Sequence, residues 1–297
     1  MDLSLDSQQE ALVAATADWC RDNMPLEQAR NRPDTLWSAL QAMGWTAMTG
    51  PDVALDHATE ALVFVELGRH LAPVSLMSGA VAARWTDQPG KVALALFGNA
   101  GVRVCDAEGA TIALGICDGV IATFRLPPGL VASPALDPTT TLARLAQPSV
   151  RTPVDSPLPA LHLQLLTAAF AAGCADAARD MASSYAALRE QFERPIGWFQ
   201  AIKHMCADMA VRCAVARAQI SFAACALDAD APDAAFHVAA ARQVAEQAAM
   251  ENARANIQVH GGIGMTDEAS PHLCLKRAHL LSFIAPARRS VLLGDPA

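Results

Sequence analysis

The chain contains few aromatic residues and few basic ones. Only 5% of its 297 residues are aromatic, and the one tyrosine is Tyr185. Lysine and arginine number 22 against 30 aspartates and glutamates, which gives a formal net charge of −8 and a pI near 5.4. Nucleic-acid binding depends on clustered Lys and Arg that displace counterions from the phosphate backbone. The composition therefore argues against a nucleic acid as partner.

Signals for membrane insertion, secretion and metal binding are also lacking. No uninterrupted apolar run reaches the length of a membrane span, and the first 15 residues lack a basic segment followed by an apolar one. We therefore expect a cytoplasmic protein that does not bind a membrane. The eight cysteines show no CxxC spacing, so neither a zinc site nor a disulfide framework is indicated. No metal site is predicted, and the cysteines are interpreted as small buried residues.

Hydrophobic residues are abundant, and their spacing divides the chain into segments. They make up 53% of the sequence, which is enough to bury a large core. From Leu5 to about Trp85 they recur at helical spacing, in runs separated by turn residues such as Pro33 and Pro73. Residues 1–88 are therefore predicted to form an N-terminal helical domain.

The pattern changes twice along the rest of the chain. Between residues 89 and 153 there are short apolar runs, such as VALALFG and GVIATFRL, divided by Gly, Asp and Pro, which predicts a small β domain. Residues 154–297 return to long helical patterns rich in Ala, Leu and Val, joined by short connections, which predicts an antiparallel four-helix bundle. The expected fold class is mainly α with a small β middle domain.

Two stretches in the predicted bundle carry a distinctive set of side chains. YAALREQFERPIGWFQ, at 185–200, and IQVHGGIGMT, at 257–266, resemble the two bundle signatures of the acyl-CoA dehydrogenase family, Y-x-x-x-R-x-Q-F-G-x-P-I-x-x-F-Q and Q-x-x-G-G-x-G-x-T. In the first domain, LWSALQAMGWTAMTGPD and ALVFVELGRHLAPVSL are similar to helices of the same family. The resemblance implies an FAD-dependent oxidoreductase with an N-terminal helical domain, a β domain and a C-terminal four-helix bundle.

The chemistry of these residues suits a flavin dinucleotide. An arginine near a helix break can meet a pyrophosphate with a planar fork of donors, and paired glycines let backbone N–H groups approach phosphate oxygens. The resemblance implies that ten residues hold the ADP half of an FAD bound mainly by the neighbouring subunit: Arg189, Gln191, Phe192, Phe199, Gln200, Gln258, Val259, His260, Gly261 and Gly262. The simpler alternative treats the arginine as a surface cation at a helix end and the glycines as a helix cap.

The catalytic base of the family has no evident counterpart in this chain. The family removes the α-proton of an acyl-CoA with a carboxylate while the β-hydride passes to flavin. Most relatives place this Glu at a position that falls on about Ala285, and others place it on the first bundle helix, near Gln164 and Phe170. We therefore predict no catalytic residue in this chain.

The other carboxylates near these positions are assigned structural roles. Asp176 and Asp180 lie further along the first bundle helix and are expected to face solvent. Asp267 and Glu268 follow the glycine turn, where a helix-cap role is expected.

The middle domain is too short for the family's full β sandwich, and it lacks the Thr- and Ser-bearing stretch that holds the isoalloxazine ring. The resemblance therefore implies a homologous larger subunit that supplies the flavin-ring site and the Glu, in an α2β2 heterotetramer of the bacterial steroid-degrading type. The implied substrate is an acyl-CoA, and the implied electron acceptor is an electron-transfer flavoprotein or a similar protein. Two alternatives remain: a stabilising subunit that binds no cofactor, and a self-sufficient homo-oligomeric dehydrogenase.

Overall fold

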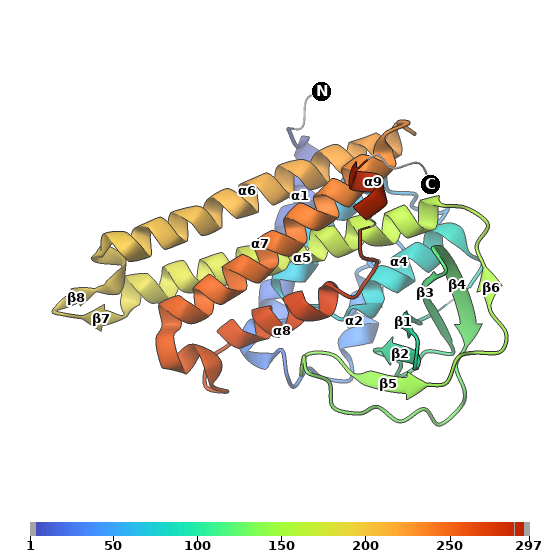
Figure 1. Ribbon diagram of the computed structural model, residues 1–297, viewed down its shortest axis with the longest axis horizontal. Coiled ribbons are helices and arrows are strands. Elements are labelled where there is room, and N and C mark those ends of the chain that lie inside the picture. Colours follow the sequence, from blue (N-terminus) through green and yellow to red (C-terminus); the bar gives the residue numbers. More distant parts are fainter. Residues whose placement is uncertain (1–3, 89, 288, 294–297) are drawn as a thin grey trace.

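The computed structural model describes residues 4–88, 90–287 and 289–293, with no account of the side chain of residue 289 (Figure 1). Helices dominate the architecture. The N-terminal region holds four: α1 (Ser7–Asn23), α2 (Leu36–Ala42), α3 (His57–Arg69) and α4 (Ser75–Trp85). The side chain of Asp6 accepts hydrogen bonds from the first backbone amides of α1, and Gln9 returns a bond to the backbone N–H of Asp6, which forms a capping box.

The middle region forms one mixed sheet of six strands in the order β5-β2-β1-β3-β4-β6. Its strands are β1 (Val92–Gly98), β2 (Gly101–Cys105), β3 (Ile112–Cys117), β4 (Val120–Arg125), β5 (Leu142–Leu145) and β6 (Thr152–Pro153). Strand β1 pairs with β3 in parallel, whereas the other pairs are antiparallel. Side chains alternate between two faces: Leu94 and Leu114 join the main helical core, while Ala95 and Phe124 join a second, smaller cluster.

The C-terminal region is a helical bundle, as the sequence predicts. Its helices are α5 (Leu158–Leu188), α6 (Gln200–Asp228), α7 (Ala234–His260) and α8 (Pro271–Leu281), followed by the short α9 (Arg289–Leu293). A small hairpin, β7 (Glu190–Gln191) and β8 (Arg194–Pro195), joins α5 to α6. It projects from the end of the bundle that lies away from the six-stranded sheet (Figure 1).

Helix α5 forms the centre of the core because glycines let α3 approach it closely. A Cβ added at Gly173 would lie 2.0 Å from the carbonyl oxygen of Val65, and one at Gly68 would lie 2.5 Å from that of Phe170. Only glycine allows this backbone separation. Helices α5 and α6 are long and apolar enough to cross a membrane by length and composition, but 83% of the apolar window of α5 is buried inside the protein, as in a core helix.

Candidate functional site

The two signature segments meet at the end of the bundle from which the hairpin projects (Figure 1). Tyr185, in the last turn of α5, stacks on His260 at the end of α7, with ring centroids 4.1 Å apart and an angle of 22° between the planes. The Nδ1 of His260 hydrogen-bonds to the carbonyl oxygen of Asn256 at 2.9 Å, and burial lowers the pKa of the imidazole. The stacked pair therefore fixes the glycine turn beside the start of the hairpin.

Arg189 is the residue at which α5 ends. Its backbone N–H donates to the carbonyl oxygen of Tyr185 at 2.8 Å, and its own carbonyl accepts from Ile196 at 2.8 Å. The side chain is exposed, and no ion pair or hydrogen bond of its guanidinium is found within the described part of the chain. The backbone is thus held in place while the guanidinium remains available to an anion.

The hairpin and the turn that follows it, residues 196–199, expose aromatic side chains. Phe192 is 83% exposed and Trp198 is 64% exposed. The rings of Phe192 and Phe199 meet edge to face at 5.9 Å. Gln191 donates from its side-chain amide to the carbonyl of Glu190 at 2.8 Å, and Gln200, also exposed, opens α6. Exposed aromatic groups of this size are typical of surfaces that contact a partner or ligand.

The double glycine has two different explanations. Gly261 ends α7 with φ of +66°, a conformation that side chains rarely adopt, so the local backbone requires glycine there. At Gly262, by contrast, φ is not in this region, and an added Cβ would meet no atom within 4 Å. Nothing in the part of the chain that the structure describes requires glycine at 262. Close approach of an external group would explain it.

Gln258 and Val259, the last two predicted residues, differ in their burial. Gln258 is exposed on the last turn of α7 and can reach an external ligand. Val259 is 5% exposed and packs in the hydrophobic core, so its side chain is directed away from such a ligand.

A neighbouring cleft of about 430 Å³ runs along α5 and α6, lined by residues that include Ser183, Trp198 and Lys203.

The positions expected to carry the base hold buried residues of other types. Ala285 is 5% exposed, and Phe170 is 1% exposed and packs against Phe64 with ring centroids 5.5 Å apart. Gln164 donates to the carbonyl oxygen of Pro286 at 3.2 Å and thereby anchors the segment after α8. None of these side chains can remove a proton as a carboxylate does.

The expectations for Asp176 and Asp267 were wrong. Asp176 does not face solvent: its side chain is fully buried, with Arg179 at 2.9 Å and Arg217, from α6, at 2.5 Å. The pattern of α5 alone could not show that another helix supplies its partner. Asp267 does not cap a helix but pairs with Arg30 at 2.5 Å, which holds the pKa of the Asp267 carboxyl below its usual range.

The expectation for Asp180 holds in part, whereas that for Glu268 is wrong. The side chain of Asp180 is 42% exposed, but it is held by Arg69 at 2.5 Å and by Arg179 at 2.7 Å. Helix α8 begins after Ser270 with no side-chain cap, so the cap role expected for Glu268 is wrong as well.

A buried polar cluster was missed by sequence reasoning. His57 and Glu60, from α3, and His162, from α5, bring their ligand atoms within 4.8 Å of one another. Trp85 donates its indole N–H to Nδ1 of His162 at 3.1 Å, so in this neutral ring Nε2 carries the proton and donates to Glu60 at 2.6 Å. That proton occupies the lone pair a metal would need, which favours a hydrogen-bonded network over a metal site.

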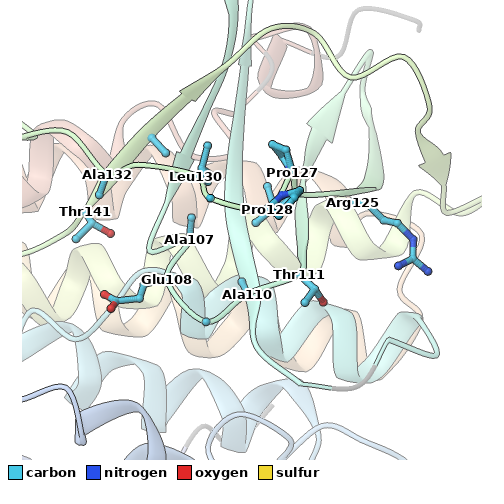
Figure 2. Close-up of a pocket in the computed structure, with 14 residues that line it drawn as sticks. Ala107, Glu108, Ala110, Thr111, Arg125, Pro127, Pro128, Leu130, Ala132 and Thr141 are labelled. Carbon is cyan, nitrogen blue, oxygen red and sulfur yellow. The ribbon is translucent and has the colours of Figure 1, made fainter.

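A cavity of about 640 Å³ lies at the sheet, between the β2–β3 connection and the loop after β4 (Figure 2). Its lining is largely Ala, Pro and Gly, with Glu108, Thr111, Thr141 and Arg125 as polar members. Figure 2 shows the guanidinium of Arg125 turned away from the centre of the cavity. None of the predicted cofactor-binding residues lines it.

Comparisons with known proteins agree with this architecture. Residues 161–285 match the family model described as acyl-CoA dehydrogenase, C-terminal domain. The acyl-CoA dehydrogenase IpdE2 of Mycobacterium tuberculosis is 33% identical over 300 residues, which cover 95% of this chain and 92% of that protein.

Two solved structures show the same fold. One is the ChsE4–ChsE5 complex of M. tuberculosis, with a TM-score of 0.71 and 21% identity over 95% of this chain and 94% of that chain. The other is the Tcur3481–Tcur3483 steroid ACAD variant G363A, with a TM-score of 0.79 and 20% identity over 97% and 96%. The predicted fold class is confirmed.

Proposed function

The chain belongs to the acyl-CoA dehydrogenase family of oxidoreductases, which act on CH–CH bonds of acyl-CoA thioesters, and we propose that it is one subunit of a heteromeric enzyme of this family. In this proposal the chain contributes the ADP-binding half of an interface FAD site. A homologous larger subunit supplies the flavin-ring site and the catalytic Glu, in an α2β2 heterotetramer. Two observations carry the proposal: the exposed guanidinium of Arg189 has no ion pair or hydrogen bond within the described part of the chain, and an added Cβ at Gly262 would meet no atom within 4 Å.

Each proposed contact follows from exposure and chemistry. FAD, when bound, accepts the β-hydride of the acyl-CoA. Arg189 neutralises the pyrophosphate with a charge-assisted fork, and the N–H groups of Gly261 and Gly262 meet its oxygens. The rings of Phe192 and Phe199 lie against the adenine, and exposed amides donate to the ribose or phosphate. The full proposed set is Arg189, Gln191, Phe192, Phe199, Gln200, Gln258, Val259, His260, Gly261 and Gly262, of which Val259 can contribute only its backbone because its side chain packs in the core.

We propose a partner because this chain has other residues at the positions where relatives carry the catalytic base. Buried Ala285 and Phe170 stand where relatives carry a base, and the middle region has one six-stranded sheet among its described residues. One solved neighbour is a complex of ChsE4 with ChsE5, and another is a steroid ACAD. We therefore propose a CoA thioester of a steroid side chain or ring as substrate, an electron-transfer flavoprotein or similar protein as acceptor, and the cytoplasm as location.

We propose three domains, of which the C-terminal one carries the cofactor contacts. Residues 1–88 are the N-terminal helical domain, and residues 89–153 are the reduced β domain. Residues 154–297 form the bundle that carries all ten proposed cofactor contacts.

Co-expression with homologous longer subunits from the same gene neighbourhood tests the proposal. We expect a yellow complex that loses flavin at least about tenfold more readily when Arg189→Ala removes the charged fork. Arg194→Ala is the matched control, because Arg194 is exposed on the same hairpin and contacts Trp198 instead. Equal flavin retention by both variants would contradict the proposed role.

Gly262→Ala gives a second, independent readout. Because an added Cβ meets no atom of this chain within 4 Å, the variant should fold with normal stability. It should nevertheless lower the flavin content of the complex, since the methyl group would stand between the backbone and the phosphate. Loss of stability with unchanged flavin would show that this glycine serves the fold alone.

A further inference from the structure

Two arginines face each other across neighbouring strands of the sheet. The register of β2 and β5 places Arg103 directly opposite Arg144. Both are exposed, and neither forms an ion pair or a side-chain hydrogen bond with any residue that the structure describes. Like charges directly opposite in an antiparallel pair destabilise a sheet. The two arginines thus have no carboxylate partner among the described residues, although acidic residues outnumber basic ones and the net charge is −8.

The pair lies in a pocket that contains no acidic residue. Its volume is about 400 Å³, and its lining comes from the β1–β2 turn, the facing parts of β2 and β5, and Phe283. Leu96 is the strand partner of Arg103 on β1, so the arginines and this leucine share one face of the sheet. Phe283, which follows α8, is 53% exposed. The pocket combines two cations with apolar walls.

The β1–β2 turn, which lines this pocket, is held in place by contacts with the end of β5 and the residues after it. Gln147 donates from its side-chain amide to the carbonyl oxygen of Gly98 at 2.7 Å. At Gly101, φ is +129° and an added Cβ would lie 2.4 Å from the carbonyl oxygen of Leu145. The backbone at the start of β2 therefore lies in close contact with the end of β5. The site is therefore built on paired strands and a tethered turn.

We propose that this pocket binds an oxyanion, a carboxylate or phosphate group, attached to an apolar body. Opposed residues in an antiparallel pair have Cβ atoms about 5 Å apart, so the two guanidinium groups can share one oxyanion. Charge-assisted bonds to both arginines offset their mutual repulsion, and Leu96 and Phe283 cover the apolar part of the ligand. The proposal is independent of the FAD contacts, because the pocket lies at the sheet and contains none of the signature residues.

Titration calorimetry on the full chain tests the site, with inorganic phosphate, coenzyme A, valeryl-CoA and glutaryl-CoA as probes. The last two differ in a terminal carboxylate. If the carboxylate is bound, glutaryl-CoA binds more tightly than valeryl-CoA, and Arg103→Met with Arg144→Met removes the difference. If a phosphate is bound, coenzyme A and both thioesters bind alike, and the double variant weakens all three. Either result supports the oxyanion site.

The single variants should each weaken the bound probe by about tenfold, the value expected for loss of one charge-assisted contact. Arg125→Met is the matched control: it removes an exposed strand arginine that lines the separate cavity in Figure 2, and should change affinity by less than about twofold. Circular dichroism should show all variants folded, because both arginines of the pocket are exposed. Equal binding by wild type and double variant, or no binding of any probe, would overturn the proposal.

Discussion

Replacement of Glu60 by glutamine should destabilise the protein strongly. The carboxylate is fully buried; its Oε2 accepts from His162 at 2.6 Å and lies 3.8 Å from a guanidinium nitrogen of Arg84. Burial alone would raise the pKa of the Glu60 carboxyl, but the adjacent His162 and Arg84 hold that pKa below its ordinary value. Glutamine keeps the shape and removes the charge, which leaves the arginine without its buried counter-charge.

The expected loss is about 3 kcal/mol of unfolding free energy, since hydrogen bonds to charged groups contribute about 1.5–3 kcal/mol and a broken buried pair costs about 3–5 kcal/mol. Urea denaturation should show a lower midpoint at an unchanged slope. Glu251→Gln is the control, because Glu251 also pairs with an arginine, at 2.6 Å, but is 36% exposed. That variant should lose less than about 1 kcal/mol. Equal losses in the two variants would refute the assigned role of burial.

Three further predictions concern the core. Burial lowers the pKa of His162, so below about pH 6.5 the unfolded chain takes up a proton at this residue that the folded chain does not. The urea midpoint should therefore fall as the pH drops below about 6.5, and a midpoint that does not change with pH would contradict this. Gly173→Ala should cost about 3 kcal/mol or more in thermal unfolding, because its Cβ would clash with a backbone oxygen of α3, whereas Gly262→Ala should melt like wild type. Asp137→Asn should cost about 3 kcal/mol by the same assay, since it leaves Arg277, 1% exposed and 2.6 Å away, without its counter-charge.

Much of the fold could be predicted because local patterns fix its elements. Helical spacing and proline punctuation indicated the N-terminal helices and the bundle, although α4 was not separated from its neighbours. Short apolar runs indicated the strands, but not that β1 pairs in parallel with β3, because strand pairing depends on residues far apart in the chain. For the same reason Asp176 was placed in solvent, although α6 supplies a partner for it.

The candidate site was predictable only to the extent that it lies in contiguous signatures. Residues 185–200 and 257–266 were found because each stretch is continuous, and the stacking of Tyr185 on His260 brings them together. The two clusters that sequence reasoning missed both join distant segments. Glu60 meets His162 from another helix, and Arg103 meets Arg144 through strand register. No local pattern signals such pairs.

The stoichiometry of flavin in the purified complex tests the central claim most directly. If the chain contributes only the nucleotide-binding half of the FAD site, as proposed, absorbance at the flavin band should give one FAD for each pair of this chain and its partner. The chain purified alone should be colourless. Two FAD molecules per pair, or a yellow chain without a partner, would contradict the account.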